Sequence, residues 1–461
     1  TAKSTFRSKG FWTGIAVGDV DNDGDDDLYL CGFDASALYR NDAGVFSEWN
    51  GSGLDVRTAP AGRSPEWRTS AGFFDYDNDG RLDLYLTRYA EFGTHLPQLC
   101  GDKTRGEQFS CSPDVYKPQI GSLYRNLGGG RFADVTRTAG VSSASGRGLG
   151  IAFGDYNNDG WTDFALANDE RPGDLFENRR GKGFVNKGVE SGTAFNPNGH
   201  VHGGMGVDWG DVNGDGWLDL FVTTYQNEVK SLYIASPGGL FTDSGLSAGL
   251  AERLDRWVSF GTKFLDFDLD GQLDLGVASG HVISNTATVY PGTVYRQQLQ
   301  LFRNDGGTFS EVTDRMDAGA RTPIVGRALA VGDLDNRGRP DIVVTQNEGA
   351  PLILRHGDEK VGNWLSLTLE GTRSNRNGFG ARVTVTAGGR KQIRDAGNSG
   401  SYAAASDARL LVGLGTESSA DIEVRWPSGR KDRYAGVSGG KHWRIREGAA
   451  APEPALASVA R

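Results

Sequence analysis

The sequence predicts an all-β protein: a β-propeller with six blades counted and seven still compatible, followed by a small β-sandwich or barrel. Three observations predict this fold. A nine-residue acidic motif recurs six times, 55 to 80 residues apart, and a period near 55 is typical of repeat architectures. Pairs of apolar segments joined by a glycine-containing turn separate the copies, as in β-hairpins. Glycine makes up 68 of 461 residues while 37% of the chain is hydrophobic, which favours many short strands over disorder.

The acidic motif reads D-x-[D/N]-x-D-G-x-x-D and runs directly into a β-rich segment. The first copy places six aspartates within nine positions, and like charges this close repel one another unless a cation neutralises them. Ca²⁺ takes about six to eight oxygen ligands, which side chains at positions 1, 3, 5 and 9 and a backbone carbonyl can supply. Glycine at position 6 permits the turn. Because the last acid stands at position 9 and a strand follows, the motif is not an EF-hand.

We name the six copies loops one to six. The predicted calcium ligands of loops one to five are Asp19, Asp21, Asp23, Asp27, Asp75, Asp77, Asp79, Asp83, Asp155, Asn157, Asp159, Asp163, Asp211, Asn213, Asp215, Asp219, Asp266, Asp268, Asp270 and Asp274. About five calcium ions are therefore expected, and five divalent ions would bring the formal net charge from −10 to zero. The alternative is a set of Asn/Asp/Gly turns without metal, which six copies at regular spacing disfavour.

Loop six departs from the motif. Arg337 stands where the other five loops have aspartate, and a guanidinium group cannot ligate a metal. It could instead lie among Asp333, Asp335 and Asp341 as a built-in cation. Metal at loop six is therefore expected to be weak or absent.

Each repeat unit contains a strand, an acidic loop, a second strand and a hairpin, which together form one four-stranded propeller blade. The sixth unit lacks its last strand after residues 350–357, and the N-terminal segment 4–10 is expected to supply it and close the ring. The propeller is assigned to residues 1–360. Residues 361–448 show alternating strands and form the small β domain, and residues 449–461 are predicted to be a disordered tail.

The cysteines and the net charge limit which cellular compartment and which classes of partner suit the protein. Cys100 and Cys111 enclose a short loop that a disulfide can staple, whereas Cys31 is most simply a buried free thiol. The net charge of −10 argues against nucleic acid as a partner, and no apolar run is long enough for a membrane-spanning helix. The chain starts at Thr1 without a methionine, which agrees with a removed leader and with a secreted, periplasmic or cell-surface protein.

Several segments together resemble a known family. The six acidic loops, the "LYRN" hairpins, "SGHV" around His281 and the C-terminal "SNRNGFGARV", "GNSGSY", "VGLG" and "VRWPSG" are similar to bacterial FG-GAP/VCBS repeat proteins that end in an ASPIC/UnbV domain, the group that includes cartilage acidic protein. The resemblance implies a calcium-binding β-propeller in a secreted or surface-associated protein. It implies no single activity. The paired histidines of "NGHVHGGMG" depart from the small residues expected there.

Charged and aromatic residues are predicted to converge on one rim of the propeller. In this architecture the innermost strand leads into the metal loop, so residues eight to eleven positions before each first aspartate should reach the opposite rim, together with the turns after each second strand. Arg and Trp side chains there suit an anionic or sugar-like ligand, although most such charges are merely solvated. The candidate ligand-binding residues are Arg68, Arg88, Arg147, Glu170, Arg256 and Trp257.

Three histidines offer a second kind of site. His200 and His202 are two positions apart, so both imidazoles would point to the same side of a strand. With His281 one blade further on and Glu228 nearby, they could hold one transition metal such as copper, zinc or iron. The competing interpretation is two surface histidines and a hydrogen-bonded His281, and it stays open.

Two functions follow from these alternatives. The first is a secreted, calcium-stabilised binding module that recognises a glycan, a peptide or a protein. The second is a metalloenzyme in which the histidine-bound metal acts on a small anionic or peptide substrate. The sequence contains no G-x-S-x-G elbow, phosphate-binding glycine loop or H-E-x-x-H motif, so it does not decide whether the protein is an enzyme.

Overall fold

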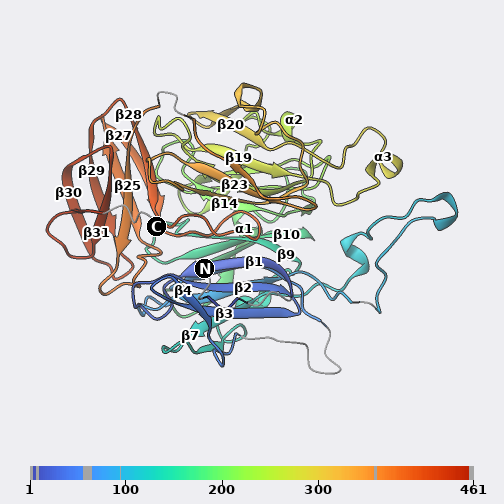
Figure 1. Cartoon of the computed structure of the whole chain (residues 1–461), viewed down its shortest axis with the longest axis horizontal. Helices are drawn as coiled ribbons and strands as arrows, with labels where there is room; N and C mark the ends of the chain where they lie inside the picture. Colours follow the sequence, from blue (N-terminus) through green and yellow to red (C-terminus); the bar gives the residue numbers. More distant parts are fainter. Residues whose placement is uncertain (1–3, 7–9, 55–64, 94, 358–360, 456–461) are drawn as a thin grey trace.

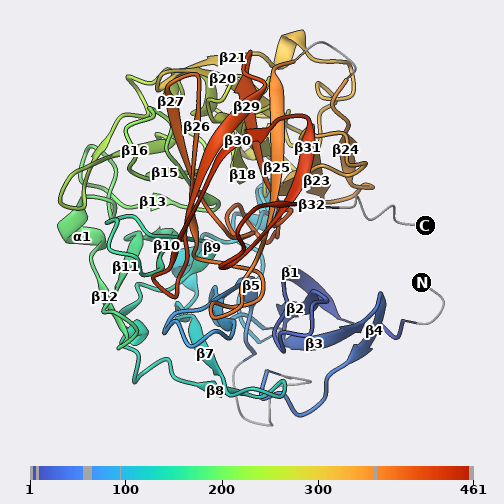
Figure 2. The ribbon, with the colours of Figure 1, turned by 90° about the vertical axis from the view of Figure 1, so that its left-hand side faces the viewer.

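The computed structural model describes residues 4–6, 10–54, 65–93, 95–357 and 361–455. In this part of the chain the repeat region forms six antiparallel sheets, one for each acidic loop, which follow one another in chain order around a centre (Figure 2). The strands of blades one to three are β1 (Phe11–Gly18), β2 (Asp27–Phe33), β3 (Ala35–Asp42) and β4 (Val45–Glu48); β5 (Arg68–Phe74), β6 (Asp83–Arg88), β7 (Ser122–Asn126) and β8 (Phe132–Asp134); and β9 (Gly148–Gly154), β10 (Asp163–Arg171), β11 (Asp174–Asn178) and β12 (Phe184–Asn186), with β13 (His202–Gly203) also paired to β10.

Blades four and five repeat this pattern, and blade six has three strands. They comprise β14 (Val207–Gly210), β15 (Asp219–Val222), β16 (Ser231–Ser236) and β17 (Leu240–Asp243); β18 (Ser259–Leu265), β19 (Asp274–Ser279), β20 (Gln300–Asp305) and β21 (Thr308–Glu311); and β22 (Gly326–Gly332), β23 (Asp341–Gln346) and β24 (Leu352–Leu354). The helices are the short turns α1 (Gly188–Ser191), α2 (Ala251–Leu254) and α3 (Thr286–Val289) and the 3₁₀ turns Lys103–Arg105, Pro113–Val115, Val141–Ser143 and Thr313–Arg315. No helix in the described residues has the length and apolar character needed to span a membrane.

Glycines allow the first strands of neighbouring blades to approach closely. A Cβ atom on Gly206 would stand 2.1 Å from the carbonyl oxygen of Phe260 in the next blade, and one on Gly261 would stand 2.4 Å from the amide nitrogen of Leu329. Only glycine fits such a separation. Apolar clusters then fill the space between consecutive blades, as where Phe74 stacks on Phe153 with ring centroids 4.2 Å apart.

The N-terminal segment does not close the ring, which corrects the sequence-based prediction. The amide of Thr5 donates to the carbonyl of Phe46 at 2.9 Å, and Phe6 packs against Tyr39 and Phe46. Residues 4–6 therefore extend the outer edge of blade one, because β4 offers both unpaired backbone groups and an aromatic surface. Blade six keeps three strands in the described residues, and residues 7–9 of the predicted strand lie outside them.

The C-terminal domain is a two-sheet β-sandwich beside the propeller (Figure 1). Its sheets have the orders β28-β25-β31-β32 and β27-β26-β29-β30, and their inner faces share one apolar core that includes Leu367, Val383 and Trp426. The strands are β25 (Asn363–Glu370), β26 (Arg382–Ala387), β27 (Arg390–Asp395), β28 (Leu410–Gly415), β29 (Ser419–Arg425), β30 (Lys431–Ser438), β31 (Lys441–Arg446) and β32 (Glu453–Pro454).

The tail predicted to be disordered from residue 449 begins with ordered structure. Strand β32 pairs with β31, with Pro454 opposite Trp443 and Glu453 opposite Arg444. The absence of hydrophobic periodicity concealed this strand, because its pairing uses backbone groups at the edge of the sandwich. Residues 456–461 lie outside the described part of the chain.

The C-terminal domain covers the face of the propeller that carries the acidic loops. The side chain of Asn377 accepts the amide of Asp19 in loop one at 2.8 Å. Arg390 donates to the carbonyl of Asp270 in loop five at 2.9 Å, and Arg409 donates to the carbonyl of Asp333 in loop six at 2.8 Å. The acidic loops are therefore both the candidate metal sites and the docking surface of the sandwich.

Residues 397–407, here called the central segment, run from the sandwich into the middle of the propeller. The segment forms hydrogen bonds with the first strand of every blade. Its partners are Val17 in blade one, Ser70 in blade two, Ile151 and Phe153 in blade three, Val207 in blade four, Thr262 in blade five, and Leu329 and Val331 in blade six. Because it contacts both blade one and blade six, the segment links the two ends of the ring.

Removing one hydroxyl group of the central segment should destabilise the protein. Ser401 is buried, and its Oγ accepts the amides of Thr262 and Leu329 at 3.1 and 3.3 Å. Ser401→Ala takes an acceptor from two buried N–H groups, so we expect the free energy of unfolding to fall by about 1–3 kcal/mol. Urea unfolding at fixed calcium concentration measures this, with Ser47→Ala on the exposed side of β4 as the control expected to change less than about 0.5 kcal/mol. Equal stability of the two variants would contradict the placement of the segment.

Candidate functional site

The six acidic loops share one backbone conformation. Position 4 has a φ between 54° and 74° in every loop, and the glycine at position 6 has a φ between 74° and 103°. Asparagine or glycine occupies position 4 in five loops, because these residues tolerate the left-handed region, whereas loop five places Leu269 there. A common backbone aims the side chains of positions 1, 3, 5 and 9 in the same way in each blade.

Two aspartates of each loop are fixed by backbone amides. The glycine at position 6 donates its N–H to the first aspartate in all six loops, as Gly24 does to Asp19 at 2.8 Å. The last aspartate accepts an N–H from the third strand of the same blade, as Asp27 does from Asn41 at 2.9 Å, or in loop six from His356 just after that strand. These bonds hold the carboxylates in place beside one another.

The side chains in these loops fit a hard divalent cation. In loops one, two, five and six the aspartates at positions 1, 3 and 9 offer oxygens that lie within 4.8 Å of one another. Buried carboxylate oxygens of Asp21, Asp77, Asp163 and Asp266 have no hydrogen-bond partner. Burial is the main cause that raises the pKa of Asp75 to about 7 and of Asp274 to about 8, and neighbouring aspartates add to both shifts. A bound cation would satisfy the free oxygens and offset the repulsion.

Loops three and four have an amide at position 3. The Oδ1 of Asn157 accepts the amide of Asp159 at 3.0 Å, and the Oδ1 of Asn213 accepts the amide of Asp215 at 3.0 Å. Asn157 and Asn213 therefore occupy the place that aspartate takes in the other loops, with one negative charge fewer per loop.

Loop six contains the built-in cation that its sequence indicates. The guanidinium of Arg337 lies 2.5 Å from the carboxylate of Asp335 and 4.0 Å from that of Asp341. Arg355, directly after β24, pairs with the same two aspartates. Two guanidinium groups thus neutralise carboxylates that still lie close enough to one another for a metal.

The hairpin motif "LYRN" has a role that was not predicted from the sequence. Its asparagine joins two loops: Asn126 donates from Nδ2 to the carbonyl of Leu82 in its own blade at 3.0 Å and to that of Val20 in the preceding blade at 2.8 Å. Asn178 and Asn304 repeat this arrangement in blades three and five. The recurrence of asparagine at the end of the segments LYRN, LFEN and LFRN was the available signal.

Most of the predicted ligand-binding residues on the opposite rim are already paired. Arg68 is buried and bonds to Glu66, which also accepts from Arg88 at 3.1 Å. Arg147 is buried and donates to Asp114 at 2.9 Å, while Glu170 accepts from the hydroxyl of Ser112 at 3.3 Å. These charged side chains pair with other residues of the rim, so few of their charged groups remain available to a ligand.

Arg256 and Trp257 remain accessible. Arg256 is exposed, and its guanidinium stacks 4.7 Å from the centroid of the half-buried Trp257 ring. Such a stacked pair presents a flat cationic surface to solvent.

The three histidines do not cluster. His200 is exposed, whereas His202 and His281 are buried. The Nε2 of His202 lies 3.3 Å from the hydroxyl of Tyr233, and that of His281 lies 3.4 Å from the hydroxyl of Tyr225. Glu228 accepts the amides of Gly203 and Tyr225. In the described residues, the groups of three or more side chains whose ligand atoms lie within 4.8 Å of one another contain no histidine. This geometry therefore gives the transition-metal hypothesis no support.

The channel behind this rim is filled. Tyr402 from the central segment packs among Met205, Val258 and Phe260, and Tyr89 and Tyr225 complete the cluster. The rim is therefore a closed surface and not the mouth of an open tunnel.

Two long loops project from the same rim, away from the C-terminal domain (Figure 1). One contains the disulfide between Cys100 and Cys111, which confirms the predicted pairing, while Cys31 is a buried free thiol as expected. The other contains α3, and the side chain of Asn285 donates to the carbonyl of Gln108 at 2.7 Å to join the two loops. Leu99, Val115 and Val294 in these loops are each about half exposed.

The buried imidazole of His202 should make stability depend on pH. Burial lowers the pKa of His202 to about 4, whereas an unfolded histidine has a pKa near 6.5. The unfolded state then binds more protons than the folded state. The contribution of neutral His202 to the free energy of unfolding is therefore complete above pH 6.5, and it falls by about 3 kcal/mol as the pH drops toward 4. We expect the difference in free energy of unfolding between wild type and His202→Gln to shrink by that amount over this range, with or without chelator. A chelator-sensitive difference would instead indicate a metal at His202.

Comparisons with known proteins agree with the repeat organisation. Residues 19–86, 115–166, 155–222, 211–277 and 266–344 match the family described as FG-GAP-like repeat, and residues 371–452 match the family described as ASPIC and UnbV. Human cartilage acidic protein 1 is 24% identical over 432 residues, which cover 90% of this chain and 60% of the relative. The mouse protein is 24% identical over 444 residues, covering 90% and 61%. The chain thus spans about 60% of the length of these relatives.

The solved structures that this chain matches include lectins. An Agrocybe aegerita lectin that recognises non-reducing terminal N-acetylglucosamine has a TM-score of 0.42 and 17% identity, and the match covers 75% of this chain and 81% of the lectin. The BP39L lectin from Burkholderia pseudomallei has a TM-score of 0.39 and 11% identity, with coverage of 93% and 100%.

The repeat matches extend over more than half of the chain, and the chain therefore belongs to the family of FG-GAP-like repeat proteins and ends in an ASPIC and UnbV domain.

Proposed function

We propose that this protein is a secreted, calcium-stabilised binding module whose ligand surface is the rim opposite the C-terminal domain. The observation that carries the proposal is the division of the propeller into two faces. The sandwich and its central segment cover the acidic-loop face and fill the channel, so the loops serve stability and docking. The opposite rim is left for a partner.

The chemistry of the loops favours calcium. Their donors are carboxylate, amide and carbonyl oxygens, which hard cations prefer, and the described clusters contain no thiolate or imidazole. Mg²⁺ demands a tighter octahedral geometry and keeps several waters, whereas Ca²⁺ accepts crowded, irregular oxygen cages. We infer that loops one to five take calcium and that the guanidinium groups of loop six replace it.

The rim suits a peptide or protein partner better than a sugar alone. The half-exposed aliphatic residues of the two projecting loops provide apolar contact area, and the Arg256–Trp257 stack provides a cationic aromatic anchor. The disulfide stiffens one of these loops, which lowers the entropy lost on binding.

Export follows from the same features. Extracellular calcium modules bind the ion with dissociation constants of about 10⁻⁴–10⁻³ M, so they require a calcium-rich compartment. Disulfides persist mainly outside the cytosol. Both conditions fit a secreted, periplasmic or surface protein.

Chelation should destabilise the protein. For a site with a dissociation constant of about 10⁻⁴ M, about 10 mM calcium contributes about 2.7 kcal/mol, and several sites contribute together. We expect excess EDTA to lower the melting temperature followed by circular dichroism, and calcium to restore it more effectively than magnesium at equal concentration. An unchanged melting curve in EDTA would contradict calcium stabilisation.

Reversing one charge on the rim should weaken binding. Arg256→Glu replaces an exposed cation beside Trp257, and we expect at least about tenfold weaker binding to whichever immobilised peptide or glycan the wild type selects from an array. The matched control is Lys431→Glu, an equal charge reversal at an exposed position of β30 in the C-terminal domain. If only Lys431→Glu weakens binding, the ligand surface lies on the sandwich and the proposed orientation is wrong.

A further inference from the structure

The ring of blades is open at one junction. The first strands of consecutive blades pack side by side from β1 through β5, β9, β14 and β18 to β22. Strands β22 and β1, which would complete the ring, do not pack against each other. Blade six and blade one are therefore the two ends of the row of blades (Figure 2). We call the place where they face each other the open junction.

Blade six exposes an apolar face that the other blades bury. Ile353 in β24 lies opposite Val343 of β23 and is 55% exposed. The residue at the same place in the other five blades is at most 3% exposed and packs with the next blade, as Leu232 of blade four does with Phe264 and Leu275 of blade five. These residues are Leu38, Leu123, Leu175, Leu232 and Leu301.

Blade one exposes the opposite kind of face. Ile15, Leu28 and Leu30 are partly exposed, whereas the residues at these three positions are buried in each of the other five blades. In those blades such residues contact the preceding blade, as Phe164 of blade three packs with Leu123 of blade two. The open junction is therefore bounded on both sides by apolar surface that a neighbouring blade covers at every other junction.

A polar contact between blades is also missing there. The asparagines that bridge blades donate to a carbonyl just after the first aspartate of the preceding loop, and the Nε2 of His356 lies 2.8 Å from the corresponding carbonyl oxygen of Phe267. Asn41, their counterpart in blade one, bonds only within its own blade in the described residues. The corresponding residue of loop six, Leu334, is 51% exposed.

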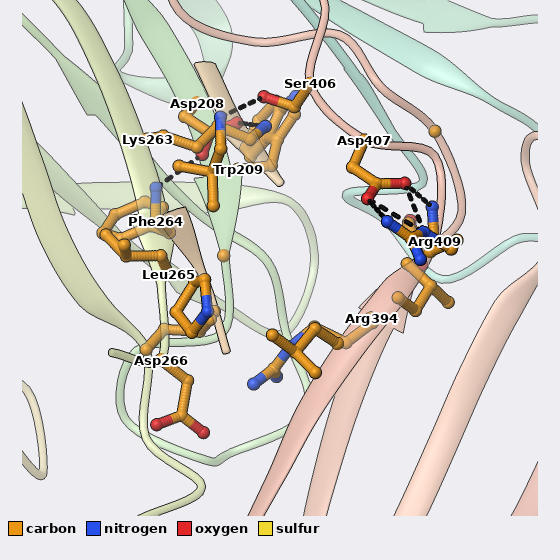
Figure 3. Close-up of a pocket in the computed structure, with 18 of the residues that line it drawn as sticks. Asp208, Trp209, Lys263, Phe264, Leu265, Asp266, Arg394, Ser406, Asp407 and Arg409 are labelled. Atoms are coloured by element: carbon orange, nitrogen blue, oxygen red, sulfur yellow. Dashed lines mark hydrogen bonds and ion pairs between the residues drawn. The ribbon is translucent and has the colours of Figure 1, made fainter. Parts of the chain in front are cut away.

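The central segment joins only the inner strands of the open junction. Asn398 bonds to β1, and Ser406 bonds to β22. Asp407, next to Ser406, pairs with Arg409 of the sandwich, as the dashed lines in Figure 3 show. These contacts tie both end blades to the C-terminal domain, while the apolar side chains on β2 and β24 stay exposed further out.

The form of the two exposed faces indicates what covers them. A single strand added beside β24 would leave Leu28 and Leu30 of blade one exposed, and a helix would not satisfy the bridging amide of Asn41. At the five closed junctions the covering element is a twisted antiparallel sheet, and every inner blade carries bulky apolar residues on both faces. An element of the same kind would cover both faces at once.

We propose that the open junction is a docking site for one blade-sized antiparallel β-sheet of a separate polypeptide. Its apolar faces pack against Ile353 and against Leu28 and Leu30. A hairpin asparagine of the partner donates to the carbonyl of Leu334, and a backbone carbonyl of the partner accepts from Asn41. This surface is separate from the rim proposed to bind a ligand, and the inference does not depend on that ligand.

A blade of this chain can serve as the probe. Residues 148–186 contain all four strands of blade three and its bridging asparagine, and they are fused to residue 1 of the full chain through a flexible linker with a protease site. In saturating calcium we expect hydrogen exchange in β1, β2, β23 and β24 to slow at least tenfold relative to the unfused chain, because docking suppresses local opening. After cleavage of the linker, the added blade should co-elute with the full chain in gel filtration.

Two matched substitutions test the surface itself. In the unfused chain Ile353→Asp should shift the melting temperature by less than about 2 °C, because the side chain is already exposed. Leu232→Asp, at the equivalent buried place of blade four, should lower it by at least about 5 °C. In the fusion, Ile353→Asp should abolish the slowed exchange and release the added blade after cleavage.

Three results would overturn the inference. The first is an equal loss of melting temperature in Ile353→Asp and Leu232→Asp, which would mean that the junction is closed. The second is unchanged exchange in fusions with blade three and with blade five, residues 259–311, while β16 and β17 show that the host remains folded. The third is a dimer of the unfused chain that Ile353→Asp dissociates, because a second copy would then cover the junction.

Discussion

Each blade depends on neutralising a cluster of carboxylates that the fold holds together. The backbone amides of position 6 and of the third strand fix the first and last aspartates beside each other, so the chain cannot relieve their repulsion by moving them apart. Burial then raises the free energy of the charged forms. A cation at the point where the first strand turns into the second would offset this cost, and in loop six Arg337 and Arg355 pair with the carboxylates.

The same loops couple the two domains. One carboxylate oxygen of Asp155 pairs with Arg425 of the sandwich, and one of Asp266 accepts the amide of Gly413, while other oxygens of these loops face the candidate ion site. The central segment continues this contact into the channel and bonds to all six first strands. The candidate ion sites and the docking of the domains therefore use the same loops, and the central segment extends this contact to both ends of the ring. This arrangement leaves the opposite rim as the surface that can vary without disturbing the fold.

Sequence reasoning predicted what is local and repeated. The spacing of acidic motifs predicted six blades, the residue types predicted oxygen clusters, and the cysteine pair predicted the disulfide. It failed where partners are distant in the sequence. The N-terminal segment pairs with β4 because Phe6 finds an aromatic neighbour there, and no repeat pattern encodes that choice. The central segment and the pairing of Arg147 with Asp114 depend on contacts between blades or domains. The short strand β32 was hidden because backbone pairing alone forms it.

The most direct test of the account is to locate calcium by anomalous diffraction at long wavelength from crystals grown in calcium and without chelator. The account predicts one anomalous peak within each of loops one to five, surrounded by the aspartates and asparagines at positions 1, 3, 5 and 9. It predicts no peak among Asp333, Asp335 and Asp341, where guanidinium groups take the place of the ion. A map without peaks in the first five loops, or with an equally strong peak in loop six, would contradict the claim that charge neutralisation by calcium or arginine organises this propeller.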